Sequence, residues 1–244
     1  MNSRQSRVQS PHVRPNYFLG FQVYNPIIHQ KVKNLQQDLI KNKPALYSTL
    51  VAVPTLHITL AVTYLANENE VDVVRKSLQD WGSKNIESLV KNPITLNFKG
   101  INTFNGKVAF LDLEHCENYD RLCDLAKEMN NLLISNGFFV DKRERYNPHL
   151  TILKVRWENM KQSMKDYKKD FELLKNCDEH FGSQLVSHVQ LLSMEDSRDE
   201  KGYYKCLCQV FTSDLPIPIM DHSVCCAPLP DPNEVNTYLS WRRT

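Results

Sequence analysis

The chain has 244 residues, with 30 Lys or Arg against 28 Asp or Glu, so its formal net charge is only +2. This length allows one large domain or two small lobes. The balanced charge excludes a global field that would attract nucleic acid or an anionic membrane, so any affinity for phosphate must be local. We expect no membrane partner, because no apolar run approaches the roughly 18 residues that span a bilayer. The N-terminus lacks the apolar core of a secretory signal.

The seven cysteines are odd in number and irregularly spaced, which does not indicate a disulfide framework. Cys206 and Cys208 are too close in sequence for a usual zinc knuckle. Only seven glycines are present, and neither GxGxxG nor GxxxxGK[ST] occurs, which argues against dinucleotide and P-loop nucleotide sites. We therefore expect a protein of a reducing intracellular compartment that needs no cofactor.

The composition divides the chain into three parts. Residues 1–15 contain three Arg, three Ser and two Pro but no acid, which predicts a disordered basic arm; a transit peptide is the alternative. Residues 16–212 are expected to form the folded domain, and residues 213–244 a proline-containing irregular tail. We expect a cytoplasmic protein, and the basic arm also allows a nuclear one.

Strands and helices alternate along the folded part. Asn67 followed by Glu70 resembles a helix-capping box, and Asn105-Gly106 is a strong hairpin signal. Gly137 stands where a helix C-terminal cap belongs. The predicted elements are a strand at 17–24, a helix at 29–41, a strand holding His57, a helix after Asn67, a hairpin at 94–113, a helix at about 119–136, a strand holding His149, a helix near 158–175 and strands at 183–194 and 203–211.

This order can be divided into two halves, each with strands, helices and one His-x-Thr sequence. The fold class expected is α+β, with two pseudo-symmetric lobes whose antiparallel sheets face a central cleft.

The two His-x-Thr sequences are "TLHITLAV" at residues 55–62 and "NPHLTILKV" at residues 147–155. Each is expected in the middle of a strand, where residues i and i+2 share a face. His57 and Thr59 then project together, as do His149 and Thr151. Across a cleft, one imidazole can act as base and the other as acid, while the hydroxyls bind phosphate oxygens. The pattern indicates attack on a phosphodiester without a metal.

Two alternatives stay open on the residues alone. A single histidine in a strand is usually structural, and only the occurrence of two copies favours a catalytic pair. A zinc site is the rival chemistry, but neither motif contains a third ligand. Upstream of His149, the basic residues Lys142, Arg143 and Arg145 favour an approach for an anionic substrate, although a solvated loop explains each of them equally well.

The paired motifs, about ninety residues apart, resemble the two-histidine (2H) phosphoesterases. Within them, "PNYFLGFQV", "FKGINTFNGKVAFLDL" and "LLSMEDSRDEKGYYKC" resemble the central domain of the A-kinase anchor protein 7 group, over about residues 15–211. The resemblance implies a LigT-like fold of two lobes and metal-independent cleavage of RNA-like phosphodiesters, with 2′,5′-linked oligoadenylate as substrate. It implies that His57 and His149 are the acid/base pair, that Thr59 and Thr151 bind phosphate, and that Phe18 lies near the adenine; a core phenylalanine is the alternative for Phe18.

The sequence departs from this group in two places. Relatives have Arg in a DHRFG segment, whereas "DEHFG" here puts His180 at that position, and an imidazole lacks the fixed charge of a guanidinium. The relatives also end in a helix that anchors protein kinase A, whereas the tail here is broken by prolines, so we do not expect anchoring.

The alternatives to a 2′,5′-phosphodiesterase are related RNA-end processing, a cyclic phosphodiesterase, a non-catalytic nucleotide- or RNA-binding module and an interaction scaffold. We expect a monomer.

Overall fold

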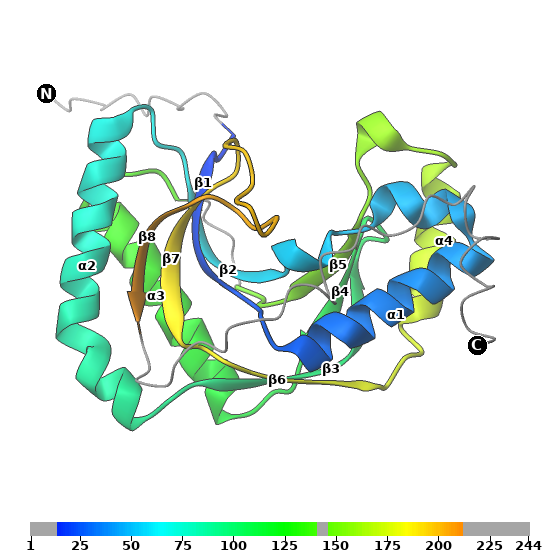
Figure 1. Cartoon of the computed structure of the whole chain (residues 1–244), viewed down its shortest axis with the longest axis horizontal. Helices are drawn as coiled ribbons and strands as arrows, with labels where there is room; N and C mark the ends of the chain where they lie inside the picture. The colour runs from blue at the N-terminus through cyan, green and yellow to red at the C-terminus, as the bar shows by residue number, and fades with distance from the viewer. Residues whose placement is uncertain (1–13, 141–145, 212–244) are drawn as a thin grey trace, which may run out of the picture.

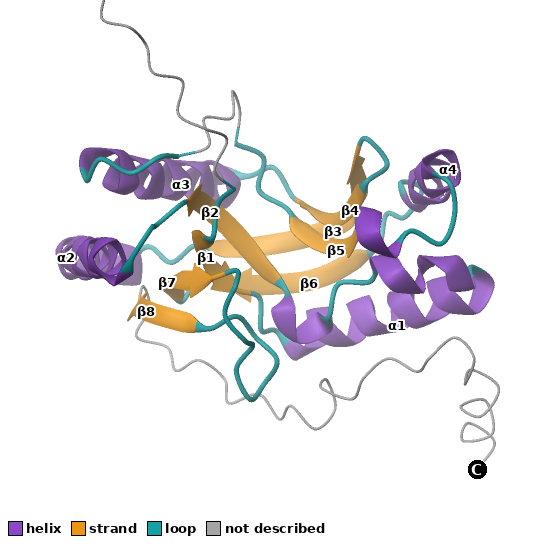
Figure 2. Cartoon of the chain, turned by 90° about the horizontal axis from the view of Figure 1, so that it is seen from above, coloured by secondary structure: helices purple, strands orange, loops and turns teal. Residues whose placement is uncertain are grey.

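The computed structural model describes residues 14–140 and 146–211. The predicted tail, and the predicted arm except for its last two residues, lie outside the described residues. The described chain forms two four-stranded antiparallel sheets with helices packed against them (Figures 1 and 2).

The first sheet has the strand order β2-β1-β7-β8 and the second the order β5-β4-β3-β6. Every recorded pairing within them is antiparallel. The strand bounds are β1 Tyr17–Gln22, β2 His57–Thr63, β3 Thr95–Phe104, β4 Val108–Leu113, β5 Leu150–Lys154, β6 His180–Leu185, β7 His188–Ser193 and β8 Cys206–Phe211.

Four α-helices divide between the two sheets. Helix α2 packs against β8 and α3 against β2, while α1 packs against β6 and α4 against β3 and β4. Figure 1 shows α2 and α3 on the left and α1 and α4 on the right. The helix bounds are α1 Pro26–Asn42, α2 Glu68–Lys91, α3 Glu117–Ser135 and α4 Met164–Leu174, with 3₁₀ turns at Pro44–Thr49, Val53–Thr55 and Trp157–Asn159.

The helix caps and the hairpin turn predicted from the sequence are present in the structure. The side chain of Asn67 accepts from the amide of Glu70 at 3.1 Å and begins α2. Asn105 and Gly106 both have positive φ, 52° and 64°, as a tight hairpin turn between β3 and β4 requires. Gly137 ends α3 with φ 82°, and the next amide, of Phe138, bonds back to Leu133.

The division into sequence halves is wrong as a description of the lobes. The first sheet combines β1 and β2 from the beginning of the chain with β7 and β8 from its end, and the second sheet takes the strands in between. Helix α1 follows a strand of the first sheet but packs on the second. Each sheet nevertheless carries one His-x-Thr sequence, as predicted.

Three predicted boundaries also change. The single strand expected at 183–194 is divided, because Val186 and Ser187 carry the chain from β6 in one sheet to β7 in the other. The helix expected near 158–175 begins only at Met164, where Ser163 caps it. The two histidines lie at the start of their strands rather than in the middle: His57 is the first residue of β2 and His149 directly precedes β5.

One continuous cluster of buried apolar residues spans both sheets, so the lobes do not have separate cores. Polar links join them as well. Gln36 of α1 donates to the carbonyl oxygens of both Val51 and Ile152, and the amide of Val51 bonds to Ile152, beside the isolated bridge between Leu50 and Leu153. The segment just before β2 is thereby attached to the edge of β5.

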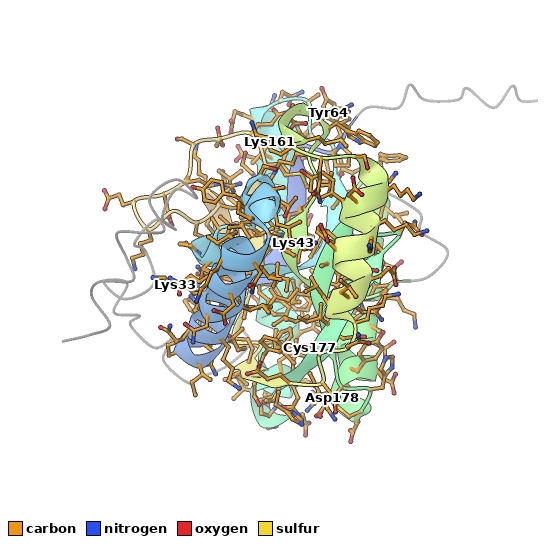
Figure 3. All side chains as sticks on the ribbon, turned by 90° about the vertical axis from the view of Figure 1, so that its right-hand side faces the viewer. Lys33, Lys43, Tyr64, Lys161, Cys177 and Asp178 are labelled. Atoms are coloured by element: carbon orange, nitrogen blue, oxygen red, sulfur yellow. The ribbon has the colours of Figure 1, made fainter. Side chains whose placement is uncertain are left out.

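Helices α1 and α4 lie side by side in Figure 3, where Lys43 is labelled at the end of α1. Its ammonium lies 2.8 Å from a carboxylate oxygen of Asp170, which is 7% exposed. Burial acts to raise the pKa of Asp170, but the hydrogen bonds from Lys43 and Gln162, with the charge of Lys43, outweigh burial and lower it. The two helices of the second sheet are therefore joined by a partly buried ion pair.

Candidate active site

His57 is held at the start of β2 by a backbone hydrogen bond and by aromatic rings. Its Nδ1 lies 2.7 Å from the carbonyl oxygen of Thr55. Its ring centroid lies 4.8 Å from that of Phe18 and 5.0 Å from that of Tyr204, which is edge-on to it. The half-buried imidazole thus has a fixed orientation.

His149 has the same kind of surroundings on the other sheet. Its Nδ1 lies 2.8 Å from the carbonyl oxygen of Asn147, again two residues earlier in the chain. Its ring centroid lies 4.8 Å from that of Phe104 and 5.2 Å from that of Phe110. Each histidine therefore has one carbonyl partner at i−2 and two aromatic neighbours.

These bonds fix which nitrogen of each histidine can exchange a proton. A carbonyl oxygen only accepts hydrogen bonds, so Nδ1 carries the hydrogen at both His57 and His149. The remaining nitrogen, Nε2, is then the one that gains or loses a proton. This is the arrangement that general acid–base chemistry requires of an imidazole.

The strands that hold the two His-x-Thr sequences contact each other, and a hydrogen bond links the first of these strands to the residue just before the second sequence. Strands β2 and β5 contact each other, and the hydroxyl of Tyr146 donates to the carbonyl oxygen of Thr59 at 2.8 Å. Burial raises the pKa of Tyr146, which therefore stays protonated as a donor. The two predicted pairs therefore lie on neighbouring segments at the junction of the two sheets.

Burial lowers the pKa of His57 to about 4. The bond to Thr55 opposes this shift, while the nearby charges of His149, Arg198 and Lys154 add to it. All three of these groups are basic, so the electrostatic field at His57 is positive. At neutral pH the His57 imidazole is uncharged and its Nε2 can accept a proton.

The strand alternation places the threonines as predicted. In β2, Ile58 and Leu60 are buried while Thr59 is half-exposed on the face of His57; in β5, Thr151 is half-exposed between buried Leu150 and Ile152. Within the described part of the chain, neither threonine hydroxyl has a recorded hydrogen-bond partner. Both are available as donors to a ligand oxygen.

Phe18 lies beside His57, but in a packed position. Its side chain is 1% exposed and belongs to a small buried cluster with Leu192 and Tyr203. In this conformation the ring has no open face for a base, so its visible contribution is to support the imidazole. The packing of Phe18 agrees with the alternative interpretation of this residue as a core phenylalanine.

Of the other two predicted binding residues, the structure describes only His180, and it does not bring His180 to the histidines. His180 begins β6, at the edge of the sheet opposite β5, and its exposed ring lies 3.7 Å from Glu114. Arg145, with Lys142 and Arg143, lies outside the described residues.

Sequence reasoning missed two residues near His57. Tyr204 contacts the imidazole edge-on, and the guanidinium carbon of Arg198 lies 3.4 Å from the Tyr204 ring centroid. Both come from the segment between β7 and β8, "MEDSRDEKGYYK". The signal was the pair of tyrosines beside a glycine in that segment, but only the fold shows that it returns to β2.

Among residues 14–140 and 146–211, no group of three or more His, Cys, Asp or Glu side chains is placed to hold a metal ion. In the same part of the chain, no helix has both the length and the apolar character needed to cross a membrane.

With the paired histidines in place, comparison with known proteins identifies the family. The family model of the AKAP7 2′5′ RNA ligase-like domain matches residues 15–211. The chain belongs to this family. The resemblance to the two-histidine phosphoesterases is thereby confirmed.

A curated member of the AKAP7 2′5′ RNA ligase-like family, A-kinase anchor protein 7 isoform gamma of Homo sapiens, is 30% identical over 194 residues. The match covers 79% of this chain and 56% of that relative, so the chain spans little more than half of its length. Since the predicted tail also lies outside the described residues, the expected lack of a kinase-anchoring helix remains a prediction. So do the monomeric state and the cytoplasmic or nuclear location.

Solved structures confirm the predicted two-lobed LigT-like fold. LigT of E. coli complexed with 3′-AMP superposes with a TM-score of 0.54 at 16% identity, covering 81% of this chain and 97% of that one. LigT complexed with ATP gives 0.53 at 16% identity, over 82% and 98% of the two chains. The protein TT0787 of Thermus thermophilus gives 0.51 at 16% identity, over 82% and 100%.

Proposed function

We propose that this protein is a metal-independent phosphodiesterase that cleaves RNA-like phosphodiester bonds, with 2′,5′-linked oligoadenylate as its preferred substrate. The observation that carries the proposal is the matched pair His57 and His149. Both have Nδ1 bonded to the carbonyl two residues earlier, and they lie at the beginnings of β2 and β5, two strands that contact each other. A pure binding module has no need of two such titratable groups.

In the proposed reaction His57 is the base and His149 the acid. Neutral His57 takes the proton from the 3′-hydroxyl next to a 2′,5′ linkage, and that oxygen attacks the phosphorus. The bond from phosphorus to the 5′-oxygen breaks, and His149, in its protonated form, gives its Nε2 proton to that oxygen. The products are a 2′,3′-cyclic phosphate and a free 5′-hydroxyl, so the proton count balances.

Thr59 and Thr151 hold the phosphate in this scheme. Each threonine lies two residues after its histidine on the same strand face, and each hydroxyl can donate to a non-bridging oxygen. Negative charge grows on those oxygens as the nucleophile bonds, so donors placed there stabilise the transition state more than the ground state.

The comparisons support a nucleotide substrate. The matched family is described as 2′5′ RNA ligase-like, and LigT was solved in complexes with ATP and 3′-AMP. The positive field at His57 agrees with an anionic ligand. These findings favour a phosphodiester over other substrates. The preference for the 2′,5′ linkage is the more specific part of the proposal.

The test is incubation of the purified protein with 2′,5′- and 3′,5′-linked oligoadenylate, each with and without EDTA. We expect faster cleavage of the 2′,5′ linkage, cyclic phosphate ends and no effect of EDTA. Equal cleavage of both linkages would refute the preference. Turnover that EDTA abolishes would indicate a metal site instead, and binding without turnover of either linkage would indicate a binding module.

A further inference from the structure

The segment between β7 and β8 places a cation and an aromatic ring next to His57. Tyr204 lies with its ring centroid 5.0 Å from that of His57, and Arg198 lies over the Tyr204 ring, with its guanidinium carbon 3.4 Å from the centroid. The sum of these two distances is therefore an upper limit for the distance between the guanidinium carbon of Arg198 and the ring centroid of His57. The guanidinium thus belongs to the immediate surroundings of the His57 imidazole, and its charge acts on His57.

Hydrogen bonds within the segment hold this arrangement. The carboxylate of Asp199 accepts from the amides of Lys201 and Tyr203, and its own amide donates to the carbonyl oxygen of Tyr203. The hydroxyl of Ser193 accepts from the amides of Glu195 and Asp196. Each end of the segment is therefore a turn closed by hydrogen bonds between a side chain and the backbone. Tyr204 directly follows the second turn, which fixes its position.

Arg198 has its charge available. Its side chain is exposed, and no ion pair between it and a carboxylate of the described residues is recorded. Two of the acids beside it have other partners: Asp196 pairs with Lys205 at 3.3 Å, and Asp199 bonds the backbone. Stacking on Tyr204 occupies a face of the guanidinium and leaves its five N–H donors, which lie in the plane, directed outward.

We propose that Arg198, stacked on Tyr204, binds a second phosphate of the substrate, next along the chain to the phosphate held between His57 and His149. The inference rests on the proposed function and narrows its substrate class. A planar guanidinium can bond a phosphate through two parallel N–H groups, which a flexible ammonium does not reproduce. The site then prefers oligonucleotides with at least two phosphates over a dinucleoside monophosphate.

The test compares a 2′,5′-linked adenosine dimer that has one phosphate with the same dimer carrying an added terminal phosphate, at the 5′ end or at the 2′ end. The wild-type protein is expected to favour one of the phosphorylated dimers by about tenfold to a hundredfold in kcat/KM, the range of a charge-assisted hydrogen bond. Arg198→Gln should lose this preference while it still cleaves the unphosphorylated dimer, and Arg198→Lys should keep only part of it.

The control is Lys91→Gln, which removes one positive charge from exposed Lys91 at the end of α2. It should keep the full preference, so that a general loss of surface charge is separated from the loss of Arg198. The inference is overturned if the wild type favours neither phosphorylated dimer, or if Arg198→Gln retains the preference.

Binding measurements separate this inference from the proposed function. If the wild type cleaves none of the dimers, the proposed function fails, and Arg198 is judged by the affinities for the unphosphorylated dimer and the two phosphorylated dimers. Tighter binding of a phosphorylated dimer that disappears in Arg198→Gln supports the second-phosphate site without catalysis. Equal affinities of the wild type for all three dimers overturn it.

Discussion

At the scale of single residues, His57 and His149 have matching surroundings although they lie on different sheets. Each has an Nδ1 bond to the carbonyl at i−2 and two aromatic neighbours. The motif itself and the shared face of His and Thr could be predicted, because strand alternation is a local property. The aromatic partners could not, since Phe18, Tyr204 and Phe110 come from other strands or from a loop.

Acid should destabilise the fold through two histidines, half-buried His57 and buried His188. Burial lowers the pKa of His57 and of His188 to about 4, whereas an unfolded histidine titrates near 6.5. Between these values the unfolded chain binds more protons than the folded one, so stability is complete above pH 6.5 and falls as the pH drops towards 4. Each group should remove about 2 kcal/mol of unfolding free energy between pH 7 and pH 5.

Urea unfolding of the wild type and His188→Gln at pH 7 and pH 5 measures this effect. His188 is 2% exposed and its Nδ1 lies 2.9 Å from the Ser187 hydroxyl, so the variant is expected to be less stable at both pH values. The informative quantity is the difference in unfolding free energy between pH 7 and pH 5. This difference should be about 2 kcal/mol smaller in the variant than in the wild type. An unchanged difference would show that His188 is not held neutral by the fold.

At the scale of elements, the site depends on how β2 meets β5. The bond from the Tyr146 hydroxyl to the Thr59 carbonyl and the pairing of Val51 with Ile152 both cross this junction. Strand β2 is also held closely on its other side: a Cβ on Gly20 of β1 would lie 2.4 Å from the carbonyl oxygen of Ile58. The local helix caps and the hairpin were readable from the sequence, but this junction joins segments far apart in the chain.

Tyr146→Phe should weaken catalysis by loosening that junction. Loss of this partly buried hydrogen bond is expected to cost about 1 kcal/mol of stability. Because a small misplacement of catalytic groups has a large effect on rate, we expect kcat to fall about tenfold with little change in KM. Steady-state kinetics with a thermal melt measures both quantities.

The control is Tyr64→Phe, at a tyrosine that is 37% exposed just after β2. It should resemble the wild type in kcat and in melting temperature. If Tyr146→Phe loses stability but keeps the wild-type kcat, the bond supports the fold and does not position the two motifs.

At the scale of the whole molecule, the first sheet is built from the beginning and the end of the folded chain, and the second sheet from the strands in between. The sequence predicted most elements and the α+β class, because periodicity and capping are local. It did not predict that β1 pairs with β7, which begins at His188, or that α1 packs on the second sheet. Those pairings join distant segments, and their energy comes from a core that spans both sheets. One consequence is that the two motifs are not positioned by independent domains.

The central claim is that His57 and His149 act together as an acid/base pair. Its most direct test is the rate of 2′,5′-oligoadenylate cleavage by His57→Gln, His149→Gln and the double variant, with His115→Gln, an exposed histidine outside the site, as control. Circular dichroism and thermal melts should show that all four fold. Each single variant should lose about 100-fold or more in kcat, the contribution of one general acid or base. The double variant should lose little beyond a single one, since the residues act as a unit. Turnover at the wild-type rate in the folded double variant would contradict the account.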